Sequence, residues 1–198
     1  MSVISSQILN KDELTQLLNI ANDTIQLSFS DEPVLPPNLG ECLPRLRELG
    51  ASFVTLKVFG ELQGCIGSIV AQGPLALDVY DKTLASAFED SRFAPLTKRQ
   101  LPHLSIEVSV LSQPERLEVA SEQALMDYLA KHKVGLILSY QHQRALFLPQ
   151  VWEQLPSPID FVQQLKRKAG WPASFWDDDM VVKTFVVDSI EGAFVGEC

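Results

Sequence analysis

The sequence predicts an α+β fold, with mixed or antiparallel sheets flanked by helices. Three observations support this class. Apolar residues recur at helical spacing in some segments, β-branched and aromatic residues gather or alternate in others, and the two kinds follow one another without a regular strand–helix–strand order. The chain has 198 residues, of which 46% are hydrophobic, so it is long enough to bury one core or two smaller ones.

The first predicted element is an amphipathic helix over residues 11–27, because leucines and isoleucines recur there every three or four positions. Asn10 and Glu13 form a capping-box pattern in front of it. Residues 31–50 then hold several prolines and glycines, which predicts a long surface connection.

A hairpin and a second helix follow. Residues 51–59 and 62–70 are rich in β-branched and aromatic residues, and Gly60 supplies a turn between them. Pro74 suits the first position of a helix, and the apolar stripe after it predicts a helix over residues 73–90.

The second half of the chain predicts an irregular stretch over residues 91–104 and then a strand over 105–111. This strand alternates, with Ile, Val and Val on one face and Glu107 and Ser109 on the other, so one face is wet or functional. The remaining predicted elements are a helix over 121–129, a hairpin of 134–140 and 145–148, a helix over 157–169 and a strand over 181–187.

Composition excludes several classes of function. The formal net charge of −9 argues against nucleic acid as the main partner, and the basic run at 166–168 is explained by the helix dipole. No apolar run approaches the length of a membrane span, and the N-terminus lacks the pattern of a signal peptide, so we expect a cytoplasmic protein without membrane contact. Three widely spaced cysteines predict neither a disulfide framework nor a metal site.

Cys65 is the first candidate for chemistry. Gly64 and Gly67 flank it inside a strand-like run, and glycine in a strand often marks a bulge or a close approach. A thiol there acts as a nucleophile if a base or a cation favours its thiolate form. The alternative is a small buried apolar residue between packing glycines.

Three further segments carry candidate residues. Arg92 is suited to grip an anion and Asp90 to orient it or to exchange a proton, while the alternative is a structural ion pair at the end of a helix. Glu107 either faces a cleft or lies in solvent. Trp152 either lines a pocket or packs in a core.

Seven blocks occur in order along most of the chain, at residues 50–56, 62–67, 87–96, 106–111, 135–138, 148–152 and 165–170. In these blocks the sequence resembles the AMMECR-one domain family, also called AmmeMemoRadiSam system protein A. The resemblance implies one domain over residues 1–198, made of two unequal subdomains with a cleft between them and both termini in the larger. It implies partners similar to Memo and radical SAM proteins, and it identifies no activity or cofactor.

One position departs from the pattern of that family, which usually reads Leu-Arg-Gly-Cys-Ile-Gly. Here the arginine position is Gln63, so a charge is replaced by a neutral hydrogen-bonding group. Two hypotheses follow.

In the first, the protein is a thiol-dependent enzyme or enzyme component that binds a small molecule or peptide in the cleft. Cys65 is then the nucleophile, Glu107 or Asp90 handles protons, and Arg92, Gln63 and Trp152 bind. The N–H groups around Gly64 and Gly67 stabilise negative charge in this hypothesis. In the second, the protein is a non-catalytic adaptor.

Overall fold

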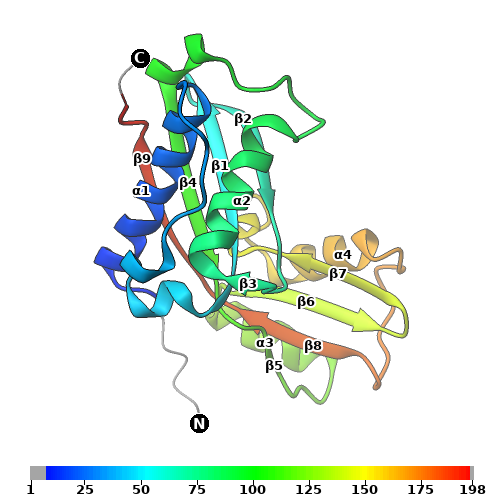
Figure 1. The fold of residues 1–198 in the computed structure, drawn as a ribbon. Coiled ribbons are helices and arrows are strands. Elements are labelled where there is room, and N and C mark those ends of the chain that lie inside the picture. The colour runs from blue at the N-terminus through cyan, green and yellow to red at the C-terminus, as the bar shows by residue number, and fades with distance from the viewer. Residues whose placement is uncertain (1–7, 197–198) are drawn as a thin grey trace. The chain divides into compact units, whose positions relative to one another are not determined.

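A computed structural model describes residues 8–196, and these divide into two compact units (Figure 1). The first unit contains the chain up to Leu111 together with the segment from Asp188 on, and the second contains Ser112–Val187. Each unit has its own sheet and its own core. The strand pairs β1–β2, β1–β4, β6–β7 and β6–β8 are antiparallel and helices flank the sheets, which confirms the predicted α+β class.

The first unit is built around a sheet in the strand order β2-β1-β4-β9, with the short β3 paired to β1. Its elements are α1 (Lys11–Ser28), η1 (Leu39–Glu41), η2 (Pro44–Arg47), β1 (Leu49–Val58), β2 (Glu61–Gly67), β3 (Gly73–Pro74), α2 (Leu75–Phe88), η3 (Lys98–His103), β4 (Leu104–Leu111) and β9 (Val187–Ala193).

The second unit has a sheet in the order β5-β8-β6-β7. Its elements are β5 (Glu115–Arg116), α3 (Glu122–Lys131), β6 (Gly135–Tyr140), β7 (Gln143–Phe147), η4 (Pro149–Glu153), α4 (Pro158–Lys168) and β8 (Val181–Phe185). Trp152 stacks on Phe161 in its core, with ring centroids 3.7 Å apart, and its indole N–H donates to the carbonyl of Val134 at 2.9 Å.

The capping box predicted for the first helix is present. The Glu13 N–H donates to Asn10 Oδ1 at 2.9 Å, and the Asn10 N–H donates to Glu13 Oε2 at 2.8 Å. Two otherwise unpaired amides of the first turn are satisfied in this way, which fixes where α1 begins.

Other predicted boundaries shift for local reasons. Gly73–Pro74 pairs with β1 as the short strand β3, so α2 begins one residue later than the proline rule suggests. The strand predicted over 62–70 ends at Gly67. The second hairpin turns on Gln141 and His142 alone, with Gln141 at φ 51°, and β7 therefore begins earlier than predicted.

The two faces of the first sheet differ in chemistry. Val54, Leu56 and Val58 are buried against α1 and α2, which lie side by side on that face (Figure 1). The alternate residues Thr55 and Lys57 are half-buried on the opposite face. This polar face also carries the side chains of Cys65 and Glu107, which pair with Thr55.

No helix within residues 8–196 combines the length and apolar character needed to cross a membrane.

Lys166 is the buried charge of the second unit. Its side chain is fully buried, and Nζ donates to Glu122 Oε1 at 2.6 Å and to the Ala173 carbonyl at 3.1 Å. This lysine ties α4 to α3 and to the segment after α4. A buried ion pair is costly to break from one side because the remaining charge loses its partner.

We expect Lys166→Met to lower the free energy of unfolding of the second unit by about 3 kcal/mol. All three tryptophans lie in this unit, so their fluorescence during urea unfolding reports on it. The matched control is Arg167→Met in the next, exposed position, which should change the value by less than about 0.5 kcal/mol. Equal effects of the two substitutions would contradict a special role for Lys166.

Candidate functional site

Cys65 lies in a row of three side chains across the first sheet. Thr55 on β1 pairs with Cys65 on β2 and with Glu107 on β4, and paired residues project to the same face. Strands are spaced by about 4.8 Å, so the backbones of Cys65 and Glu107 are about 10 Å apart with Thr55 between them. The Thr55 hydroxyl donates to Cys65 Sγ at 3.3 Å, and Cys65 is half-buried.

Gln63 is the extra residue of a β-bulge just before the cysteine. The register passes from the pair Leu56–Gly64 to the pair Lys57–Leu62 and leaves Gln63 unpaired. Its amide Nε2 donates to the Ala94 carbonyl at 2.6 Å, and its Oε1 accepts from Gln100 at 3.0 Å. Gln63 therefore fastens the segment after α2 to the sheet. Its role in ligand binding stays a prediction, one that requires the amide to exchange these partners.

Gly64 allows α2 to approach the sheet closely. A Cβ at this position would lie 2.0 Å from the backbone oxygen of Ser86. The Ser86 hydroxyl enters the ladder between β1 and β2, where it accepts from the Ile66 N–H at 2.9 Å and donates to the Val54 carbonyl at 2.8 Å. The Ile66 N–H and the Val54 carbonyl therefore have partners within the protein. Gly64 is needed because it lets α2 pack this close to the sheet.

Gly67 serves packing as well. A Cβ there would lie 2.2 Å from the ring of Phe53 and 2.5 Å from the Ser52 carbonyl oxygen. The N–H groups of Cys65 and Ile66, which lie between Gly64 and Gly67, are bound to Asp90 and Ser86. These two amides would have to leave their present partners to stabilise a developing negative charge, and that use of them stays a prediction.

Asp90 and Arg92 hold both sides of the Cys65 main chain. Asp90 Oδ2 accepts from the Cys65 N–H at 2.9 Å, while Arg92 Nη2 donates to the Cys65 carbonyl at 2.9 Å. The two side chains also pair with each other, at 2.7 Å from Nη2 to Oδ2 and 2.9 Å from Nε to Oδ1. The predicted ion pair at the end of the helix is thus present, and it includes Cys65.

This arrangement fixes the charge states. The Arg92 side chain, and then the Cys65 N–H, hold the pKa of Asp90 well below its usual range. Asp90 is consequently ionised near neutral pH and engaged by several donors, which makes it a positioning residue in this structure. Its role in proton transfer stays a prediction. Asp90 in turn raises the pKa of Arg92, and the neighbouring Cys65 adds to the rise.

Glu107 belongs to a second group of charges on the same face. Lys57 Nζ lies 3.2 Å from Glu107 Oε2 and 3.1 Å from Glu191 Oε1, and the Ser109 hydroxyl lies 3.5 Å from Glu107 Oε1. Burial alone would lower the pKa of Lys57, but the hydrogen bonds to Glu191 and Glu107 outweigh it and raise the value. Lys57 therefore stays charged, and Glu107 faces a cation.

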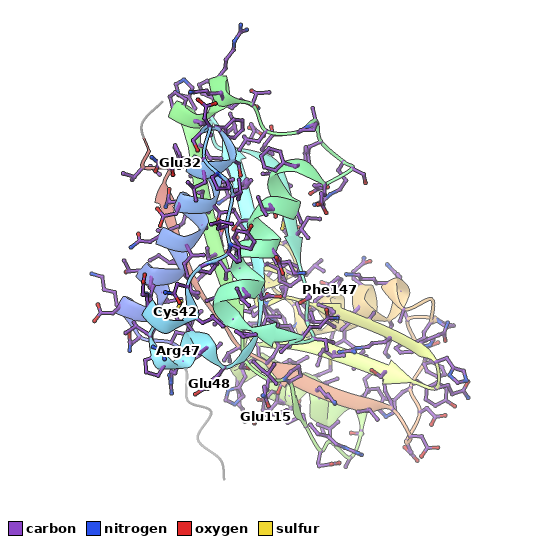
Figure 2. The ribbon with its side chains drawn as sticks, in the orientation of Figure 1. Glu32, Cys42, Arg47, Glu48, Glu115 and Phe147 are labelled. Atoms are coloured by element: carbon purple, nitrogen blue, oxygen red, sulfur yellow. The ribbon has the colours of Figure 1, made fainter. Side chains whose placement is uncertain are left out.

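The predicted candidate Trp152 and two further residues with reactive side chains lie away from Cys65 along the chain. Trp152 packs in the core of the second unit, as its alternative reading proposed. Cys42 is buried beside Arg47, whose Nε donates to the Cys42 carbonyl at 2.7 Å, and burial raises the pKa of this thiol (Figure 2). His103 stacks on Phe59 at the hairpin end of β1. Among residues 8–196, no three His, Cys, Asp or Glu side chains are grouped to hold a metal ion.

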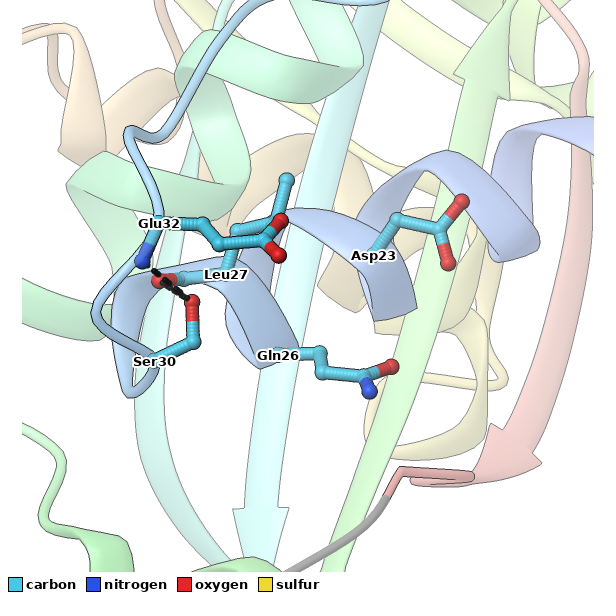
Figure 3. A pocket seen from close by; sticks show the side chains of 5 residues that line it. All are labelled: Asp23, Gln26, Leu27, Ser30 and Glu32. Atoms are coloured by element: carbon cyan, nitrogen blue, oxygen red, sulfur yellow. Dashed lines mark hydrogen bonds between the residues drawn. The ribbon is translucent and has the colours of Figure 1, made fainter.

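A cavity of about 370 Å³ opens at the C-terminal end of α1 (Figure 3). Its lining residues are Asp23, Gln26, Leu27, Ser30 and Glu32. Both carboxylates are exposed to solvent, and none of the predicted site residues lines it. The cleft between subdomains stays a prediction, and the candidate site is built from the first unit alone.

Comparisons with known proteins agree on one family. The AMMECR1 family profile matches residues 18–190. A protein of Sulfolobus acidocaldarius is 34% identical over 185 residues, covering 89% of this chain and 80% of that protein. A protein of Aquifex aeolicus is 37% identical over 170 residues, covering 84% and 85% respectively. The crystal structure of an uncharacterized protein of Pyrococcus horikoshii, PH0010, superposes with a TM-score of 0.76 at 27% identity, covering 94% of each chain.

We expect Gly64→Ala to lower the free energy of unfolding by about 3 kcal/mol, because the new methyl group meets a backbone oxygen that cannot move away freely. Gly73→Ala is the matched control, since a Cβ there meets nothing within 4 Å. Urea unfolding followed by far-UV circular dichroism measures both. A Gly64→Ala protein as stable as the control would disprove the close approach of α2.

Asp90→Asn should destabilise the protein in a pH-dependent way. The folded pKa of Asp90 is depressed, so its carboxylate adds stability above the pKa of an unfolded aspartate, about 3.9, and this contribution is lost as the pH falls toward the folded value. The difference in Tm between wild type and variant should be largest at neutral pH and shrink below about pH 4. A difference that stays constant through the acid range would refute the assignment.

Proposed function

The chain belongs to the AMMECR1 family, and we propose that it is a thiol-dependent enzyme or enzyme component that acts on a small molecule or peptide at Cys65. One observation carries the proposal. The main chain of Cys65 is fastened on both sides by Asp90 and Arg92, while its side chain has only the Thr55 hydroxyl as a hydrogen-bond partner among the described residues. A thiol held in this way is oriented and still half-accessible.

Thr55 and Arg92 are the polar neighbours of Cys65. The nucleophilic form of a cysteine is the thiolate, which accepts hydrogen bonds, and the Thr55 hydroxyl is placed to donate to the sulfur. The Arg92 guanidinium is bound to the carbonyl of the same residue. A reduced thiol of this kind fits the cytoplasmic setting that we propose.

The proposed step is acyl transfer. The Cys65 thiolate attacks an acyl carbon, the S–C bond forms, and the bond from that carbon to its leaving group breaks with the electron pair going to the leaving group. The thiol proton passes to solvent, and the leaving group takes up a proton. Glu107 lies two strand spacings, about 10 Å, from Cys65 on the same face, which is too far to exchange the thiol proton directly. Water or an acceptor then takes the acyl group and restores the thiol.

A second candidate function is a non-catalytic adaptor for partners similar to Memo and radical SAM proteins. The tip of the β1–β2 hairpin favours it, because the side chains of Phe59 and Leu62 are exposed by 72% and 43%. Such exposed apolar side chains are typical of protein contacts when they form a larger patch.

Acetylation by p-nitrophenyl acetate tests the first function. With Cys42 and Cys198 replaced by Ser, we expect a burst of p-nitrophenolate equal to the protein concentration, and an acetyl group on Cys65 by peptide mass analysis. Thr55→Val should slow the burst about tenfold, because a hydrogen bond to a charged sulfur is lost.

Two variants serve as controls for this experiment. Cys65→Ser should abolish the burst, and Thr15→Val, which removes an exposed hydroxyl from α1, should leave it unchanged. A Cys65 that is acetylated only after unfolding in urea would disprove the thiol function and leave the adaptor as the remaining candidate.

A further inference from the structure

Charged groups lie at both ends of the row of side chains that crosses the first sheet. At one end Arg92 and Asp90 form a pair that is neutral as a whole, in which the guanidinium is exposed and the carboxylate is buried. Arg92 lies at the edge strand β2, beside Cys65. Glu107 and Glu191 lie toward the other edge, on β4 and β9, with Lys57 between them. Two carboxylates and one ammonium leave that end with a net charge of −1.

Arg92 is held in place by part of its guanidinium group, and the N–H groups of Nη1 remain available to donate. Its Nε and Nη2 donate to Asp90 and to the Cys65 carbonyl, while no hydrogen bond of Nη1 is found within the described part of the chain. The side chain is 57% exposed. A guanidinium that is already held in place loses little freedom when it binds an anion, and the two N–H groups of Nη1 are left to donate to a carboxylate.

At the other end of the row, the carboxylates of Glu107 and Glu191 can accept a further hydrogen bond. Within residues 8–196, Glu107 Oε1 has only the 3.5 Å contact with Ser109, and the side chain of Glu191 is 45% exposed. Thr55 separates this end from Cys65 by two strand spacings, or about 10 Å. An extended peptide covers about 3.3–3.6 Å per residue, so three residues span the distance.

We infer that the substrate is a short peptide-like acid, with a carboxylate bound by Arg92 beside Cys65 and an N–H or ammonium group bound at Glu107. This inference rests on the proposed function and adds to it the class and the direction of the substrate. The whole protein carries a net charge of −9, which repels anions in general. A preference for anions at Cys65 must therefore come from local charges, and Arg92 is the cation in contact with this residue.

Charged thiol reagents test the inference directly. Sulfonatoethyl and trimethylammonioethyl methanethiosulfonate are of similar size and opposite charge. With each, the thiolate forms a mixed disulfide and releases methanesulfinate. The protein carries only Cys65, with Cys42 and Cys198 replaced by Ser. For each state of the protein we take the rate with the anionic reagent divided by the rate with the cationic one. We expect this ratio to be about fivefold to tenfold higher in the native protein than in the same chain unfolded in urea. That change corresponds to about 1–1.4 kcal/mol of charge interaction.

Two variants locate the effect. Arg92→Gln should remove the anionic preference, and Arg92→Lys should retain part of it because the charge remains. Glu107→Gln should raise the rate of the anionic reagent by less than Arg92→Gln lowers it, because Glu107 lies farther from the sulfur. The native-to-unfolded ratio in the parent chain needs no variant, so it decides the question even if Arg92→Gln does not fold.

The outcomes separate the two proposals. If Cys65 reacts with neither reagent in the native protein, the proposed function itself fails. If it reacts with both but the native and unfolded ratios agree, or if Arg92→Gln slows both reagents equally, the thiol function stands and the anionic substrate is overturned. A triglycine that protects Cys65 from neutral iodoacetamide better than triglycine amide would support the carboxylate end, and equal protection would count against it.

Discussion

The first unit depends on the close approach of the last turn of α2 to the edge strand β2. Ser86 and Asp90 are four residues apart, at the end of that helix and just beyond it, and they accept hydrogen bonds from the consecutive amides of Ile66 and Cys65. Gly64 makes this possible because any side chain there would overlap the backbone of Ser86. The position of the cysteine on the sheet and the position of the Asp90–Arg92 pair are therefore set by one contact.

This contact explains why the main-chain groups of Cys65 are firmly bound while its side chain is only half-buried. Its N–H and carbonyl are both bound by charged groups, which are stronger partners than neutral ones. Its sulfur faces the polar side of the sheet with the Thr55 hydroxyl beside it. A rigid backbone with an accessible side chain is what a reactive group requires, because orientation is then maintained without burying the reacting atom.

Sequence patterns predicted the features that depend on residues close together in the chain. The Asn10–Glu13 box, the alternation that places Glu107 on a polar face, and the unusual glycines around Cys65 are all visible within a few residues. The contacts of Ser86 and Asp90 with β2 were not predicted because their partners lie 20 and 25 residues away. The positions of Thr55 and Lys57 next to the candidate residues follow only from the strand register, which pairs β1 with β2 and β4. The partners of the Gln63 amide within the protein were not predicted either, because they too lie far along the chain.

Amide hydrogen exchange at Cys65 measures how firmly Asp90 holds the strand β2. On an edge strand an outward-facing N–H normally exchanges quickly, but here Asp90 accepts its hydrogen bond. We predict slow exchange at Cys65 and Ile66 in the wild type, and a selective loss of protection at Cys65 in Asp90→Ala. Fast exchange at Cys65 in the wild-type protein would mean that the end of α2 does not hold the strand, and the thiol would then lack the fixed position on which its proposed chemistry depends.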